Sequence, residues 1–173
     1  MQFDKEKTLN AKPVFQADGI VTAAASSNLT DGASCIILAS KKAIETYNLI
    51  PLAKVLSYAD ASQDPARFTT TPSLAIPKAL QKCGISINKI EIFEINEAFS
   101  VVALANLKIL GVSADKCNIY GGGVSMGHPL GSSGSRIVGT LVNAMTRENK
   151  KLGVASICNG GGGASAIVLE RCQ

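Results

Sequence analysis

The chain has 173 residues, of which 46% are hydrophobic and 5% aromatic, and it contains no tryptophan. This composition is typical of buried strands covered by helices, so it predicts a globular α/β unit and excludes a disordered tail. The formal net charge is +4 with Lys and Arg scattered along the chain, which argues against a nucleic-acid partner but allows a small anionic substrate.

The five cysteines form no CxxC pair, and their number is odd. This pattern argues against a zinc cage and a secreted disulfide framework and favours a reducing compartment. No uninterrupted apolar run is long enough to predict a membrane span. We expect no secretory leader from the first residues and no peroxisomal address from the last four.

Residues 1–32 are rich in small and polar side chains and have no amphipathic period, so they predict an extended segment that packs on another part of the protein. Residues 34–38 (SCIIL) predict a short buried strand. Ser40 is placed to cap a helix over 41–48, with Asn48 near its end. This strand and helix have no sheet of their own.

From Pro51 the pattern becomes regular, starting with an apolar stretch at 52–60. A helix ending at Gly84 follows a Thr- and Pro-rich loop, and Pro77 is expected to limit its amino-terminal extent or to kink it. Residues 90–95 predict a strand, followed directly by a helix that ends at Gly111.

Residues 118–120 lead into a glycine loop, and residues 133–148 predict a helix with one apolar face formed by Ile137, Val138, Leu141, Val142 and Met145. Residues 153–158 and 164–170 predict two closing strands around the loop NGGGG. Alternating strands and helices predict right-handed crossovers and a mostly parallel sheet with helices on its faces.

Candidate chemistry gathers where the predicted strands end. Of 16 glycines, 12 lie after residue 120, which suggests close backbone approach to a ligand. Asn96, His128 and Cys158 all fall at the carboxyl ends of predicted strands, the edge at which open α/β sheets bind ligands.

Each of these three residues also has a structural interpretation. His128, the single histidine, stands between Gly127 and Pro129 before a helix, a position suited to a general base or to an oxyanion donor, although isolated histidines are more often structural. Asn96 at a strand–helix junction is as readily explained as a helix cap, and Glu97 as a partner of the helix dipole.

Cys158 precedes an asparagine and four glycines whose amides are placed to form an anion-accepting nest, so we expect an exposed, activated thiol there. The other four cysteines are interpreted as small core hydrophobes: Cys35, Cys83, Cys117 and Cys172. A phosphate-binding GK[ST] loop is absent, and a single histidine makes a clustered metal site untenable.

Three sequence blocks together resemble the carboxy-terminal signatures of the thiolase family. They are NEAF at 96–99, GGGVSMGHPLGSSGSRI at 121–137 and CNGGGGAS at 158–165, and the similarity extends back through VTAAASSNLTDGA. Within the family the chain looks closest to the mitochondrial-type acetoacetyl-CoA thiolases of eukaryotes. The resemblance implies a core domain of order βαβαβαββ over 51–173, with a mostly parallel mixed sheet and helices on its faces. It is preceded by the end of a CoA-binding loop domain (1–32) and the last strand and helix of the first core domain (33–50).

The resemblance also implies the reaction and its residues. The reaction is a reversible condensation of two acetyl-CoA molecules, in which one cysteine is acylated and a second handles the α-proton. Cys158 matches the acid/base cysteine and His128 the histidine that activates the nucleophile and stabilises the enolate oxygen. Asn96 matches the asparagine that holds a water beside it, and Gly160 the glycine whose amide completes the oxyanion hole of the acyl intermediate.

Ser27 matches the family's pantetheine-contacting serine, and Lys7 a basic residue near the CoA nucleotide. A potassium ion is implied on the backbone carbonyls of Ala23, Ala24, Ser26 and Val124, where Ser26 replaces a family alanine. The resemblance implies CoA and acetyl-CoA as substrates without a tightly bound cofactor, a homodimer or homotetramer, and a mitochondrial location, the alternative being cytoplasmic.

The family chain is about twice as long, and its amino-terminal half carries the acylated cysteine, so we expect this chain alone to be inactive. Two interpretations stay open: part of an enzyme completed by the missing half, or a non-catalytic module that binds acyl-CoA or a protein. A ketoacyl-synthase-type enzyme is a third, disfavoured by the cysteine motif. The uncovered apolar surface predicts self-association or marginal stability.

Overall fold

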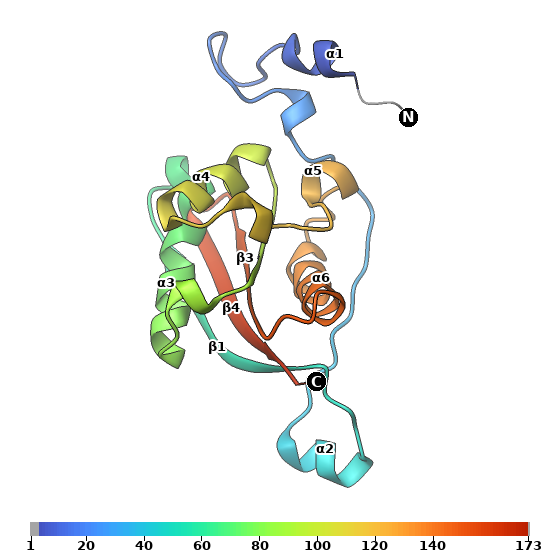
Figure 1. The fold of residues 1–173 in the computed structure, drawn as a ribbon. Helices are drawn as coiled ribbons and strands as arrows, with labels where there is room; N and C mark the ends of the chain where they lie inside the picture. Colours follow the sequence, from blue (N-terminus) through green and yellow to red (C-terminus); the bar gives the residue numbers. More distant parts are fainter. Residues whose placement is uncertain (1–3, 173) are drawn as a thin grey trace.

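A four-stranded mixed sheet is the centre of the fold in the computed structural model, which describes residues 4–172 (Figure 1). The strands are β1 (Ala53–Ser62), β2 (Ile92–Ile95), β3 (Leu152–Cys158) and β4 (Gly163–Arg171), in the order β1-β4-β3-β2. β2 pairs parallel with β3, whereas β4 pairs antiparallel with both β1 and β3.

The predicted α/β class with a mixed sheet is therefore confirmed, although antiparallel pairings outnumber the parallel one. The loop between β3 and β4 contains only residues 159–162, and so short a connection permits only an antiparallel hairpin. β4 lies between β1 and β3, so two of the three pairings are antiparallel even though β1, β2 and β3 all point the same way.

Helices cover both faces of the sheet. The helices are α1 (Lys5–Leu9), α2 (Lys41–Tyr47), α3 (Pro72–Cys83), α4 (Ser100–Leu110), α5 (Gly123–Met126) and α6 (Ser133–Arg147), with short 3-10 turns at 23–25, 65–70, 87–89 and 114–116. α3 and α4 lie on one side of the sheet and α6 on the other (Figure 1).

Alternate residues of each strand feed two separate cores. Phe93, Ile95 and Val154 belong to the core that packs against α3 and α4. Ile92 and Ala155 belong to the core under α6, together with the helix residues Ile137, Leu141, Ala144 and Met145. A sheet buried on both faces explains why its strands read as continuous apolar runs instead of alternating with polar residues.

Several predicted boundaries are confirmed by cap geometry. α3 and α4 end at Gly84 and Gly111, whose positive φ angles of 69° and 66° favour glycine. The Ser40 hydroxyl accepts a hydrogen bond from the Ala43 amide at 3.2 Å, and Asn48 ends α2 in the left-handed region with φ of 50°. α6 buries the face predicted for it.

Three predicted features differ from the structure. Residues 34–38 form no strand and are exposed, because no neighbouring strand among the described residues offers hydrogen bonds to them. The third strand of the βαβαβαββ order, expected near 118–120, is reduced to a single parallel bridge between Phe93 and Cys117. α3 runs through Pro77 and begins five residues earlier, at Pro72. Proline is tolerated there because the first amides of a helix have no acceptor within the helix.

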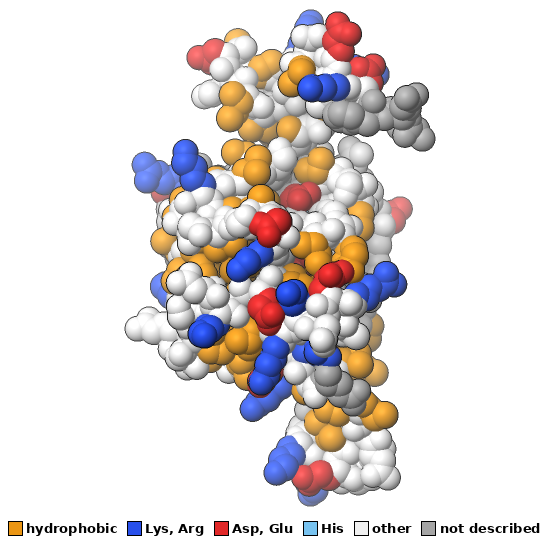
Figure 2. Space-filling view, in the orientation of Figure 1, with side chains coloured by type: hydrophobic (Ala, Val, Ile, Leu, Met, Phe, Trp, Pro, Cys, Tyr) orange, Lys and Arg blue, Asp and Glu red, His pale blue; other side chains and the backbone are white. Residues whose placement is uncertain are grey.

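Apolar side chains are exposed along the segment that leads into β1. Ile37, Leu38 and Leu52 are 86%, 79% and 64% exposed. The segment that contains α1 and the one that contains α2 project from opposite ends of the sheet domain, and hydrophobic side chains lie on both projections (Figures 1 and 2). The expected self-association stays a prediction, and this surface is its physical basis.

Leu141, fully buried on α6, is expected to be a principal contributor to stability. Replacing it with Ala should lower the free energy of unfolding by about 2–5 kcal/mol because it leaves a cavity between α6 and the sheet. Leu104→Ala, on a helix residue that is 60% exposed, is the matched control and should change the same quantity by about 0.5 kcal/mol or less. Urea denaturation followed by circular dichroism measures both, and equal losses would contradict the assignment of this core.

Candidate active site

Asn96 lies at the carboxyl end of the parallel strand pair. It directly follows β2, its amide donates to the Ser156 carbonyl of β3 at 3.0 Å, and its side chain is 2% exposed. α4 begins only at Ser100, with Phe99 as its N-cap. The helix-cap explanation of Asn96 is therefore wrong, and the buried amide faces another partner.

His128 stands on the loop between α5 and α6, and residues 28–30 hold that loop in place. The His128 amide donates to the Asn28 carbonyl at 2.8 Å, and a parallel bridge joins Leu29 to His128. Gly127 adopts φ of +91°, and its α-carbon packs against Thr30. The polar segment 1–32 thus packs on the site through its last residues, as its composition predicted.

Asn96 and His128 meet through their side chains. Asn96 Nδ2 lies 3.3 Å from His128 Nε2, and Ser133 Oγ of α6 lies 2.6 Å from His128 Nδ1. Ser133 donates its own proton to the Pro129 carbonyl at 3.1 Å, so it accepts from a protonated Nδ1. Nε2 therefore carries a lone pair and accepts from the Asn96 amide, which defines one neutral tautomer of the imidazole.

Burial favours that neutral form. His128 is 8% exposed, and its pKa is lowered from the ordinary value, first by burial and then by the positive charge of Arg136 on α6. A neutral imidazole with an unprotonated Nε2 is a base able to accept one proton.

Cys158 ends β3 on the sheet face covered by α3 and α4, where it belongs to the core. It is 8% exposed, and burial raises the pKa of its thiol. The expectation of an exposed, activated thiol is therefore wrong, because the apolar surroundings favour the protonated form. Among the described residues, no hydrogen bond joins Cys158 to the Asn96–His128 pair.

The remaining cysteines divide into two groups. Cys83 and Cys117 are half-buried and pack against the core, as the interpretation of small hydrophobes predicted. Cys35 and Cys172 are exposed, so that interpretation is wrong for them. Both lie outside the sheet, where no core covers them.

The glycine loop after Cys158 is organised by Asn159. Its Oδ1 accepts from the amides of Gly161 at 3.1 Å and Gly163 at 3.3 Å, and its carbonyl accepts from Gly162 at 3.2 Å. The expected nest of four glycine amides is thus mostly occupied internally. Within residues 4–172 only the Gly160 amide of this loop has no acceptor, and no atom lies within 4 Å of where its side chain would point.

Of the two predicted CoA contacts, the structure brings one near the site. Ser27 donates from both its amide (3.1 Å) and its hydroxyl (3.0 Å) to the Ala98 carbonyl, two residues beyond Asn96. Lys7 is exposed on α1, which lies at the end of the molecule away from α2 (Figure 1). No hydrogen bond among the described residues links Lys7 to the loops of the site.

Two of the residues predicted to hold potassium take part in hydrogen bonds within their own turn. The Ala23 carbonyl accepts from the Ser26 amide at 3.3 Å, and the Ser26 hydroxyl donates to Thr22 at 2.7 Å. No hydrogen bond or bridge among residues 4–172 joins Val124 to Ala23, Ala24 or Ser26. The potassium site stays a prediction of the resemblance.

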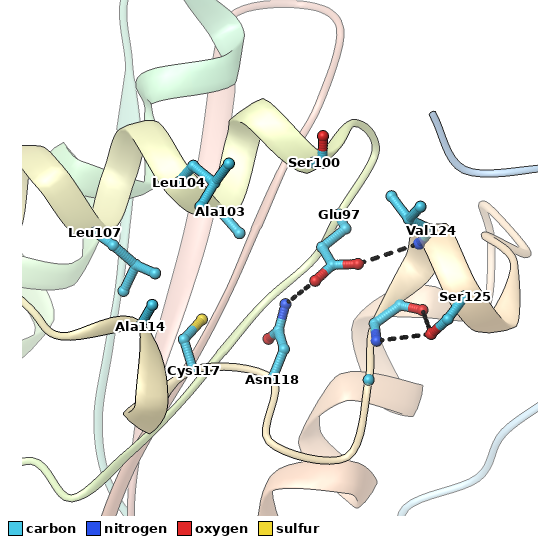
Figure 3. A pocket seen from close by; sticks show the side chains of 12 residues that line it. Glu97, Ser100, Ala103, Leu104, Leu107, Ala114, Cys117, Asn118, Val124 and Ser125 are labelled. Carbon is cyan, nitrogen blue, oxygen red and sulfur yellow. Dashed lines mark hydrogen bonds between the residues drawn. The ribbon is translucent and has the colours of Figure 1, made fainter. Parts of the chain in front are cut away.

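Glu97 has a role that sequence reasoning missed. Its carboxylate accepts from Asn118 Nδ2 at 2.7 Å and from the Val124 amide at 3.2 Å, beside a cavity of about 380 Å³ under α4 (Figure 3). A Cβ on Gly122 would lie 2.3 Å from the Glu97 Cδ atom. Glu97 therefore ties the β2–α4 junction to α5, and the helix-dipole explanation is wrong because α4 starts three residues later.

Two further charged residues lie behind the site, and sequence reasoning missed both. Glu94 of β2 is 2% exposed, and burial raises its pKa to about 8 against the opposing effect of Arg136. Arg136 Nη2 lies 3.4 Å from Asn96 Oδ1. A polar residue at the fifth position of the apolar run 90–95 was the available signal for Glu94.

Gly127 should not tolerate a side chain. Its φ of +91° is strained for any L-residue, and an added Cβ would lie 2.4 Å from Thr30 Cγ2, so Gly127→Ala should lower the free energy of unfolding by about 1–3 kcal/mol. Gly131→Ala in the same loop meets no atom within 4 Å and has no positive φ, so it should be near neutral. Equal unfolding midpoints in urea for the two variants would contradict the loop conformation.

Glu94 should make stability depend on pH. Its pKa rises from 4.5 to about 8 on folding, so the folded state binds the proton more tightly and stability falls as pH rises between those values. The lowered pKa of His128 acts in the opposite direction only below 6.5. Between pH 6.5 and 8 the free energy of unfolding should fall by roughly 1–2 kcal/mol. Glu94→Gln should remove this slope in urea titrations, whereas parallel curves would show that Glu94 is already ionised.

Solved structures share this fold. A crystal structure of human mitochondrial 3-ketoacyl-CoA thiolase superposes with a TM-score of 0.97 at 38% identity, over 99% of this chain and 44% of that chain. The structure of Acat5 thiolase from Ascaris suum in complex with coenzyme A gives a TM-score of 0.89 at 42% identity, over 98% of this chain and 44% of that chain. The chain has a thiolase fold.

Sequence comparisons reach the same family. Residues 49–171 match the model of the thiolase C-terminal domain and residues 2–42 that of the thiolase N-terminal domain, so the chain belongs to the thiolase family. The acetyl-CoA acetyltransferase of Schizosaccharomyces pombe is 55% identical over 168 residues, covering 97% of this chain and 42% of the relative. The cytosolic acetyl-CoA acetyltransferase ERG10 of Gibberella zeae is 49% identical over 173 residues, covering 100% and 43%. The chain spans less than half the length of these relatives.

None of the helices in residues 4–172 combines the length and the apolarity that crossing a membrane requires.

Proposed function

We propose that the chain is the carboxy-terminal part of an acetyl-CoA C-acetyltransferase, an acyltransferase that reversibly condenses two acetyl-CoA molecules to acetoacetyl-CoA and CoA. The observation that carries the proposal is the Asn96–His128 pair at the carboxyl edge of the sheet, with an unprotonated imidazole Nε2. The names of the relatives from S. pombe and G. zeae support this substrate. Since the chain spans under half of each, the activity is proposed for the whole protein.

His128 would act first as a base. In the cleavage direction its Nε2 lone pair takes the proton of a nucleophilic thiol, which the remainder of the protein supplies, as that thiol attacks the 3-keto carbonyl. The protonated Nε2 and the Asn96 amide then both present donors toward one point. A substrate oxygen or a bound water at that point would be stabilised as negative charge develops on the departing enolate.

Cys158 would act as the acid. Burial keeps its thiol protonated, so it can give that proton to the enolate carbon after the bond between C2 and C3 breaks, which releases acetyl-CoA. In condensation the thiolate takes the same proton back. The Gly160 amide, with no acceptor in its own loop, is placed to bind the oxygen of the acyl intermediate, which CoA then cleaves.

Substrate binding and assembly complete the proposal. Ser27 would contact the pantetheine arm, since it lies beside residue 98, and Lys7 the nucleotide. The exposed apolar surface around Ile37 and Leu52 would be covered in a homo-oligomer or by the rest of the protein. The name of the G. zeae relative describes it as cytosolic. We therefore propose the cytosol in place of the mitochondrial location.

The function is tested by CoA-dependent cleavage of acetoacetyl-CoA. The 173-residue chain should be inactive alone and should cleave the substrate when a thiolase amino-terminal half is co-expressed with it. Cys158→Ala should then lower kcat by about 10²- to 10⁴-fold, because it removes the proton donor. Cys83→Ala, at a half-buried cysteine with no role in the proposal, is the matched control and should retain turnover.

Other outcomes would change the proposal in defined ways. Turnover by the chain alone that is lost in Cys158→Ala would make Cys158 the nucleophile and overturn this division of roles. Tight acyl-CoA binding without turnover, in the presence of the amino-terminal half, would favour the non-catalytic binding module.

A further inference from the structure

Arg136 reaches the site from behind, out of the first turn of α6. Glu94 lies on β2 and Asn96 directly follows that strand two residues later, so both face the side of the sheet that α6 covers. Ser133 and Arg136 are three residues apart on α6 and so share one helix face. Each element therefore contributes two polar side chains to one small interface within the otherwise apolar core.

The chemistry of Arg136 dictates how the Asn96 amide is oriented. A guanidinium has only donors, so the Asn96 atom that faces Arg136 Nη2 at 3.4 Å has to be the oxygen. The atom that faces His128 Nε2 at 3.3 Å is then the amide nitrogen, a donor. If the amide were flipped, two sets of donors would face each other in the core without an acceptor.

We propose that Arg136 is a positioning residue, which holds the Asn96 amide in the one orientation that aims Nδ2 at His128 Nε2. The Ser133 end of this series of hydrogen bonds fits the same tautomer, because the Pro129 carbonyl is in place to take the Ser133 proton. The direction of donation along this series of hydrogen bonds thus matches at both ends, where the Arg136 guanidinium can only donate and the Pro129 carbonyl can only accept.

The guanidinium is available for this role because its surroundings leave it few other partners. Its Nε atom is buried and has no hydrogen-bond partner among residues 4–172, and the same holds for Glu94 Oε1. Since burial raises the pKa of Glu94 to about 8, the carboxyl is mostly protonated at neutral pH and does not neutralise the arginine. The charge on Arg136 therefore stays directed at Asn96 and His128, and it lowers the pKa of His128.

This inference deepens the proposed function and rests on it for its catalytic meaning, but its test needs no turnover. His128 is the single histidine of the chain, so the imidazole nitrogens of the ¹⁵N-labelled 173-residue protein are assigned without ambiguity. The wild type should show the Nδ1–H tautomer and a through-hydrogen-bond coupling between Asn96 Nδ2–H and Nε2. In Arg136→Met, which keeps apolar bulk but loses the donor, the Nε2–H population should rise about tenfold. Arg136→Lys, which keeps a donor and the charge, should restore the wild-type tautomer.

A wild-type tautomer in a folded Arg136→Met protein would overturn the inference, as would a wild-type chain in which Nε2 carries the proton. If Arg136→Met does not fold, the wild-type coupling and the Arg136→Lys spectrum still test the inference, since either one showing a proton on Nε2 would contradict it. Failure of acetoacetyl-CoA cleavage with normal tautomer results would reject the proposed function and leave the positioning role intact.

Discussion

The pairing of the short strand β2 with β3 is the contact on which the rest of the site depends. It is only four residues long, from Ile92 to Ile95, yet it sets which side chains face α6 and where the chain leaves the sheet. Because successive residues alternate between faces, a slip by one position would exchange Glu94 with Phe93 and turn Asn96 away from His128. On the other edge of β2, the Asn118 side chain accepts from the Ile95 amide and donates to the Ile95 carbonyl, which fixes the end of the strand.

Desolvation is the common cause of the site's electrostatics. Burial is the largest contribution to the pKa shift of His128, Cys158 and Glu94, and in each case it favours the uncharged form. A site of this kind holds a neutral base and a neutral acid at the same pH. Proton transfer between substrate and protein then needs no ion to be carried into the core from solvent.

Much of the fold followed from local sequence signals, and the failures have specific physical reasons. Gly84, Gly111, Ser40 and Asn48 mark helix ends through backbone conformation and capping, which depend on neighbours in sequence alone. Strand formation at 34–38 depends on a partner strand, and the sequence pattern carries no information about whether one is present. Sheet direction likewise depends on which strands become neighbours, and the insertion of β4 between β1 and β3 could not be predicted from periodicity.

The candidate site shows the same division. The positions of Asn96 and Cys158 at strand ends were predictable because strand ends are visible in sequence, whereas His128 was expected at a strand end and lies instead on the loop between α5 and α6. The protonation states of all three were not predictable, because these depend on burial and on partners far away in the chain: Ser133 and Arg136 lie on a helix that only the fold brings to β2. The expectation of an activated thiol failed for this reason, since an adjacent glycine loop says nothing about the apolar wall behind Cys158. The fold adds to the sequence motif a direction of hydrogen-bond donation. A series of hydrogen bonds that starts at a guanidinium, which only donates, and ends at a carbonyl, which only accepts, favours donation in one direction.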